Sequence, residues 1–151
     1  MVILYWDTDV SDYNEYAMTD EEIAIKRSYY RSNLTAVINA VQAANVSRMA
    51  ISGPTILGEG LFFRQYLYVS RENKKSMLND YRQINMDIAE ELGVDYIDMR
   101  KAYLQALPAY WFFPAYHLTL DGEHPNDRGT GIIVKEFAKQ ISEWTGALVK
   151  S

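Results

Sequence analysis

The most informative stretch of the sequence is Leu120-Asp121-Gly122-Glu123-His124-Pro125-Asn126-Asp127-Arg128-Gly129. It holds one of only two histidines, three residues after an aspartate and just before the last amphipathic segment. An imidazole moves protons near neutral pH, and a nearby carboxylate can hold it in one tautomer and stabilise its protonated form. Asn126 or Asp127 can cap the helix that follows. The stretch therefore predicts a proton-transfer pair, Asp121 and His124, held at the start of a helix.

Three short apolar runs elsewhere in the chain are typical of buried strands. The first is Val2-Ile3-Leu4-Tyr5-Trp6, the second covers residues 48–52, and the third covers residues 94–99. Helical patterns lie between and after them. A capping box at Thr19 and Glu22 begins a helix that should end near Ala44, and further helices are expected over residues 77–92, 100–107 and the C-terminal segment.

The final helix should turn five apolar side chains inward: Ile132, Ile133, Phe137, Ile141 and Trp144. Alternation of strands and helices implies a parallel sheet. A length of 151 residues, 48% of them hydrophobic, suits one domain with its own core. We therefore expect a single α/β domain over residues 1–151, with a three-layer, flavodoxin-like parallel sheet.

Charge and composition exclude several classes of function. The 20 acidic residues outnumber the 15 basic ones, which argues against nucleic acid or an anionic membrane as the main partner. The absence of cysteine excludes disulfides, thiol catalysis and cysteine-based zinc sites. No apolar run approaches the ~20 residues of a membrane span, so a soluble chain is expected, of unspecified compartment.

The block from Asp121 to Asn126, followed by Gly129 and a helix, resembles the last conserved block of the SGNH, or GDSL-type, esterases and lipases. The order of the other elements resembles the later two-thirds of such a domain. The resemblance implies hydrolysis of a small-molecule ester without a cofactor or a metal. It also implies that His124 is the general base and that Asp121 orients it.

The sequence departs from the family at its other catalytic blocks. No Gly-Asp-Ser tripeptide, which carries the family's nucleophile, occurs in the chain. Where the family has a Gly-x-Asn-Asp block, this chain has Asp7-Thr8-Asp9, so that only Asp9 matches and Thr8 stands in place of the amide that donates to the oxyanion. Ser52 ends a strand and is a candidate for the site rim, although its hydroxyl is expected to bond to local backbone. These departures predict a chain that is incomplete or inactive by itself.

The first strand also predicts an interaction. In the family another strand pairs with it, so residues 2–6 are expected to be completed by a partner chain, by a second copy or by a missing N-terminal segment, because apolar strand edges invite pairing. An SGNH-like domain without catalysis, acting as a scaffold or subunit of a larger assembly, is an alternative.

A second alternative starts from the same strand. Asp7 and Asp9 resemble the Asp-x-Asp motif of haloacid-dehalogenase-type phosphatases, in which one aspartate attacks phosphorus, the other acts as acid and base, and Mg²⁺ neutralises the phosphate. Ser52 would match the second motif of that family.

Overall fold

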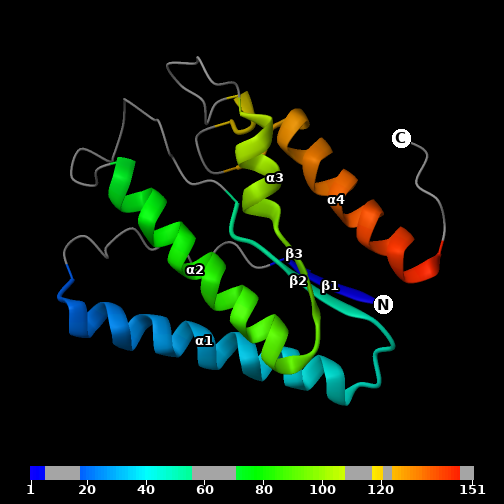
Figure 1. Ribbon diagram of the computed structural model, residues 1–151, viewed down its shortest axis with the longest axis horizontal. Helices are drawn as coiled ribbons and strands as arrows, with labels where there is room; N and C mark the ends of the chain where they lie inside the picture. Colours follow the sequence, from blue (N-terminus) through cyan, green and yellow to red (C-terminus); the bar gives the residue numbers. More distant parts are fainter. Residues whose placement is uncertain (6–17, 56–70, 108–116, 121–123, 147–151) are drawn as a thin grey trace.

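Parallel strands form the centre of the fold, and helices cover both faces of the sheet (Figure 1). The computed structural model describes residues 1–5, 18–55, 71–107, 117–120 and 124–146. The strands are β1 (Val2–Tyr5), β2 (Met49–Ser52) and β3 (Asp95–Ile97). They lie in the order β1-β2-β3, and both pairings are parallel. The prediction of a parallel α/β fold is confirmed.

Four helices lie in the described chain in the order that the sequence predicts, although the second begins at Arg71 and not near Met77. Helix α1 (Asp20–Ala43) begins with the predicted capping box, in which the Thr19 side chain accepts from the backbone of Glu22 and Glu22 bonds back to Thr19. The other helices are α2 (Arg71–Leu92), α3 (Met99–Ala106) and α4 (Asp127–Thr145). Gly93 ends α2 with a positive φ of 63°, a conformation that glycine adopts without strain.

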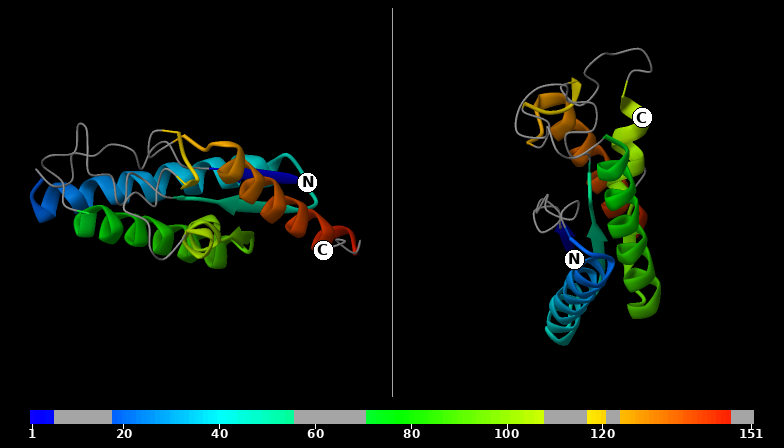
Figure 2. Two further views of the ribbon diagram at one scale, coloured as in Figure 1. Left: turned by 90° about the horizontal axis from the view of Figure 1, so that it is seen from above. Right: turned by 90° about the vertical axis from the view of Figure 1, so that its left-hand side faces the viewer.

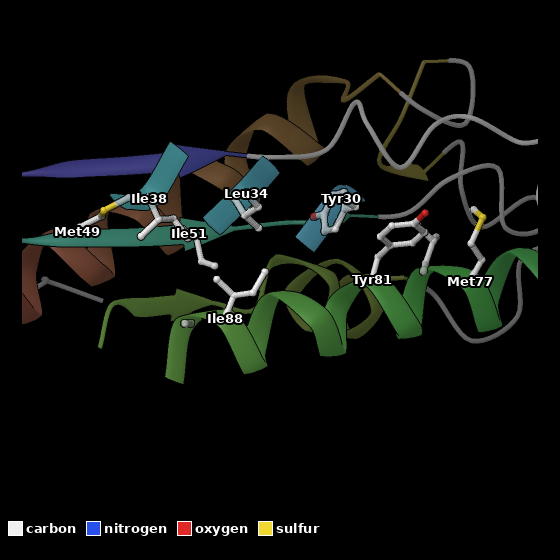
Figure 3. Close-up of a cluster of buried hydrophobic side chains, with 10 residues drawn as sticks. Tyr30, Leu34, Ile38, Met49, Ile51, Met77, Tyr81 and Ile88 are labelled. Atoms are coloured by element: carbon white, nitrogen blue, oxygen red, sulfur yellow. The ribbon is translucent and has the colours of Figure 1, made fainter. Parts of the chain in front are cut away.

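Alternating residues of the strands belong to two apolar clusters, one on each face of the sheet. Leu4, Ile51 and Tyr96 pack with α1 and α2 on one face of the sheet, and Figure 3 shows this cluster between those helices and β2. Ile3, Ala50 and Ile97 point the other way, where α3 and α4 pack. The end-on view in Figure 2 shows that α1 and α4 lie nearer the β1 edge of the sheet, and that α2 and α3 lie nearer its opposite edge. The molecule is therefore layered helix, sheet, helix.

Two further predictions about element bounds and faces are wrong. The third strand was expected over residues 94–99, but β3 ends at Ile97, because the Asp98 side chain accepts from the Lys101 backbone and caps α3. Ile141 was expected on the inner face of the last helix, but its side chain is 43% exposed. In the part of the chain that the structure describes, no helix has both the length and the apolar character that crossing a bilayer requires.

An ion pair joins α2 to the start of α3. Arg82 Nε donates to Asp98 Oδ1 over 2.8 Å, and Arg82 Nη2 donates to Asp98 Oδ2. Burial alone would raise the pKa of the Asp98 carboxyl, but hydrogen bonds from Arg82 and Lys101 outweigh burial and hold this pKa below its ordinary value of 3.8. A carboxyl group with a depressed pKa in the folded state stabilises that state above the ordinary pKa and loses the effect as the pH falls.

We therefore predict that Asp98→Asn lowers the free energy of unfolding by roughly 0.5–1 kcal/mol at pH 7, because the partly exposed ion pair is lost while the asparagine oxygen can still cap α3. The difference from the wild type should shrink as the pH falls below the ordinary value of 3.8. Urea unfolding at pH 7 and at pH 3 measures it. Glu90→Gln, at an exposed position of the same α2 helix, is the control and should have little effect at either pH. An equal deficit at both pH values would contradict the linkage.

Candidate active site at the carboxyl edge of the sheet

The ends of the three strands lie side by side. Tyr5 pairs with Ser52, and Ser52 pairs with Ile97. In open parallel sheets, functional side chains gather just beyond this edge. The segments that leave it are residues 6–9 after β1, the Gly53–Thr55 turn after β2, and Asp98 after β3. The candidate site is therefore described through the side chains that bind the segments leaving this edge.

A buried hydrogen-bond network holds the turn after β2. The carbonyl oxygen of Gly53 accepts from Asn85 Nδ2 over 3.0 Å and from the Tyr96 hydroxyl over 2.8 Å. The Tyr30 hydroxyl in turn donates to Asn85 Oδ1 over 2.7 Å. Burial raises the pKa of Tyr96, and the charge of Asp98 raises it further. The phenol therefore keeps its proton and remains a donor to the turn.

Arg100 holds the next part of the same turn. Its side chain is fully buried, donating from Nη1 to the Thr55 carbonyl over 3.0 Å and from Nε to Asn79 Oδ1 over 2.9 Å. Gly53 has a φ of 112°, which glycine adopts far more readily than other residues. The Gly53–Thr55 turn beside the strand ends is thus fixed by side chains from α1, α2, β3 and α3.

Ser52 lies in the core beneath this turn. Its side chain is 0% exposed, and within the described residues its Oγ has no hydrogen-bond partner. The expectation that local backbone satisfies this hydroxyl is therefore wrong. The alternation that turns Ala50 toward α3 and α4 also turns Ser52 that way. A hydroxyl enclosed in this way is not placed to attack a substrate that enters from solvent.

The histidine block closes a tight hairpin before α4. Thr119 and Pro125 form an antiparallel bridge, the Leu120 backbone donates to the His124 carbonyl over 2.8 Å, and the Asn126 backbone donates to the Leu118 carbonyl over 3.0 Å. The backbone on both sides of residues 121–123 is therefore fixed. The His124 side chain is exposed.

Asn126 ties the hairpin to the helix. Its Oδ1 accepts from the backbone of Arg128 and Gly129 over 3.0 and 3.1 Å, so Asn126, and not Asp127, is the residue that caps α4. Its Nδ2 donates to the carbonyls of His117 and Thr119 over 3.2 and 3.3 Å. One side chain thus fixes both the helix start and the loop that carries His124.

The direction of α4 puts this hairpin at the carboxyl edge. Near the other end of the helix, Gln140 and Trp144 both donate to Asp95, the first residue of β3. Phe137, in the middle of the helix, meets the Tyr5 ring at a centroid distance of 6.2 Å. The beginning of α4 therefore lies toward the strand ends (Figure 1). The His124 hairpin therefore lies at the same carboxyl edge of the sheet as the Gly53–Thr55 turn.

The other predicted site residues lie outside the described residues. These are Asp121, which was expected to orient His124, and Asp7, Thr8 and Asp9 after β1. Among the described residues, no three His, Asp or Glu side chains come close enough together to hold a metal ion. Sequence reasoning missed the roles of Asn85 and Arg100, because nothing in a local pattern shows which turn a helix side chain will reach.

Comparison with known proteins identifies the fold. No protein-family model and no curated protein matches the sequence. Solved structures do match. A catalytic mutant of an acetylxylan esterase from Geobacillus stearothermophilus matches 93% of this chain with a TM-score of 0.67 at 16% identity. The acetyl xylan esterase AlAXEase also matches 93%, with a TM-score of 0.65 at 22% identity. A GDSL-like lipase from Bacteroides thetaiotaomicron matches 95%, with a TM-score of 0.58 at 17% identity.

These likenesses define an α/β fold of the SGNH, or GDSL-type, hydrolase kind, as the histidine block predicted. The chain spans only part of each of the three structures, namely 58%, 66% and 62% of their lengths. The phosphatase alternative gains no support from these matches.

The packing of the hairpin against the helix start predicts the effect of one added methyl group. A Cβ built at Gly129 would lie 2.2 Å from the Leu118 carbonyl oxygen and 3.0 Å from the Tyr103 hydroxyl. Gly129→Ala should therefore push α4 from the hairpin and cost about 1–3 kcal/mol of unfolding free energy. At Gly131 a Cβ would meet nothing within 4 Å. Gly131→Ala should be neutral or stabilising by up to ~1 kcal/mol.

Urea unfolding of both variants measures these energies, and the NMR shifts of the His124 ring report any movement of the hairpin. Equal stability of the two variants would show that α4 is not packed tightly on Leu118.

Proposed function

We propose that this chain carries the acid–base part of an ester hydrolase site, with His124 as general base and then general acid. The observation that carries the proposal is the fold likeness to esterases together with a fixed hairpin that presents His124 beyond the strand ends. Asp121 is proposed to accept a hydrogen bond from His124 Nδ1, so that Nε2 is the nitrogen that takes up the proton.

The proposed reaction is acyl transfer through a serine. The serine oxygen attacks the ester carbonyl while its proton passes to His124 Nε2, and the same proton then goes to the departing alcohol. Water attacks the acyl-serine in the second half, with His124 accepting and returning a proton in the same way. Thr8 and Asp9 are proposed to border the position of the carbonyl oxygen, where a donor would stabilise the negative charge that develops.

We further propose that the serine lies outside residues 1–151. The absence of a Gly-Asp-Ser tripeptide and the full burial of Ser52 support this. Two of the similar structures are acetylxylan esterases. Acetyl esters of carbohydrates are therefore the first substrates to test, and p-nitrophenyl acetate is a convenient reporter.

A second role, as a non-catalytic subunit of a larger assembly, is favoured by a different observation. Several large apolar side chains of the helices are exposed, among them Ile25, Tyr29 and Val134. Apolar surface of this kind marks protein contacts when it is contiguous.

The ester hydrolase proposal predicts a dependence on His124. The tagged chain should be purified, with any polypeptides bound to it, from the organism that makes it. This preparation should hydrolyse p-nitrophenyl acetate, and a fluorophosphonate probe should label a serine outside residues 1–151. His124→Ala should lower the rate by about 10⁴-fold, whereas His117→Ala, at the only other histidine, should leave it unchanged. Labelling of a serine within residues 1–151 would contradict the external nucleophile. Activity that survives His124→Ala would contradict the acid–base role.

A second prediction concerns the tautomer of His124 and needs no partner. If Asp121 accepts from Nδ1, ¹⁵N NMR of the neutral ring should show the proton on Nδ1, and Asp121→Asn should shift it toward Nε2. The ring of His117, which lies 3.1 Å from Arg128 Nη1, is the internal reference and should not change. An unchanged His124 tautomer in Asp121→Asn would rule out the pair.

A further inference from the structure

A pocket of about 340 Å³ opens between helices α2 and α3 (Figure 1). The described residues that line it are Asn79, Arg82, Arg100, Lys101, Leu104 and Gln105. The α2 side is held to the start of α3 by the bonds of Arg82 to Asp98 and of Arg100 to Asn79. Pockets that bind small molecules usually measure at least about 300 Å³ and bring a few polar groups together. This pocket therefore has the size and the fixed frame that a small ligand requires.

The polar groups of this lining are mainly hydrogen-bond donors. Arg82 gives Nε and Nη2 to Asp98, which leaves its Nη1 available. Arg100 Nε donates to Asn79 Oδ1 over 2.9 Å, so the Asn79 amide is held with its oxygen occupied and its Nδ2 as a remaining donor. Among the described residues, neither Lys101 Nζ nor Asn79 Nδ2 has a hydrogen-bond partner. Donors that outnumber the acceptors around them favour an acceptor-rich ligand, such as an anion.

The charge of the lining favours an anion as well. The lining has three cationic side chains and, among its described residues, no carboxylate, on a chain whose net charge is −5. Asp98, beside the pocket, pairs with Arg82, whereas Lys101 has no ion-pair partner among the described residues. The neighbouring groove of about 360 Å³ between α3 and α4 differs, because the carboxylates of Asp98, Glu136 and Glu143 line it. Of the two, the pocket between α2 and α3 has the lining that attracts an anion.

An apolar side chain lines the pocket beside these donors. Leu104 is 39% exposed, and the methylene stems of Arg82 and Lys101 add apolar surface of their own. An inorganic anion gains nothing from such surface, whereas an aromatic carboxylate buries its ring there. We infer that the pocket binds a small organic carboxylate, whose oxygens accept from Asn79, Arg82 and Lys101 and whose apolar part packs on the leucine. The inference does not depend on the ester chemistry proposed for His124.

Titration of the chain with sodium benzoate at constant ionic strength, followed by ¹H–¹⁵N NMR, tests the inference. Benzoate should shift the side-chain amide of Asn79 and the backbone amide of Lys101, with a dissociation constant on the order of 1 mM. Benzamide has the same shape without the charge, so it should bind roughly 10-fold more weakly. Acetate has the charge without the ring and should also bind roughly 10-fold more weakly.

Two lysine variants separate this pocket from the general charge of the chain. Lys101→Ala should weaken benzoate binding roughly 10-fold, because a hydrogen bond to a charged group is lost. Lys139→Ala removes the same charge from α4, outside the pocket, and should leave benzoate binding unchanged. Urea unfolding should show that both variants are folded.

Asn79→Asp tests the oriented amide. The variant keeps an oxygen that accepts from Arg100 but replaces the donor with a negatively charged oxygen, so benzoate binding should weaken by roughly 10-fold or more. Benzoate that binds no more tightly than benzamide or acetate would overturn the inference, and so would wild-type affinity in Lys101→Ala or Asn79→Asp. The comparison of the three ligands uses the wild type, so it decides the question even where a variant does not fold. These readouts involve no ester, and their outcome leaves the His124 experiments unaffected.

Discussion

The hydrogen bonds that converge on the Gly53 carbonyl are the constraint on which the arrangement of this fold depends. Asn85 from α2 and Tyr96 from β3 both donate to it, and Tyr30 from α1 donates to Asn85. Three elements far apart in the sequence are thereby fixed to the end of the central strand. Apolar packing alone tolerates small shifts of a helix along a sheet, but a buried polar group left without its partner costs about 1–3 kcal/mol. The network therefore sets the register in which α1, α2 and β3 pack.

The predictable part of the fold comes from local patterns. The capping box at Thr19 placed the start of α1, and Gly93 placed the end of α2, because each is a short-range backbone device. The face of the last helix was less predictable. Ile141 belongs to the apolar stripe of the helix, but the sheet does not cover the whole stripe. Periodicity in the sequence does not show which apolar residues the sheet covers. Ser52 illustrates the same limit, since its hydroxyl is buried without a hydrogen-bond partner among the described residues, which the local sequence does not reveal.

The candidate site divides in a similar way. The block from Asp121 to Asn126 was recognisable because its chemistry and its turn residues are adjacent in the sequence, and solved structures with this fold include esterases. What holds His124 in place was not recognisable. Asn126 bonds to two carbonyls before the loop and two amides after it, and Gly129 leaves room for Leu118 against the helix. A loop fixed at both ends can present one imidazole in one direction, which general acid–base chemistry requires.

The distribution of charge connects the site to the surface. Ion pairs and capping carboxylates lie on the α2 and α3 side, where Arg82 meets Asp98 and Arg31 meets Glu91. These interactions stabilise helix packing within one chain. On the β1 side, the described residues pair β1 only with β2, at the edge of the three-stranded sheet. A strand that pairs at this edge would lie beside Tyr5, whose sequence neighbours Thr8 and Asp9 we propose for the site.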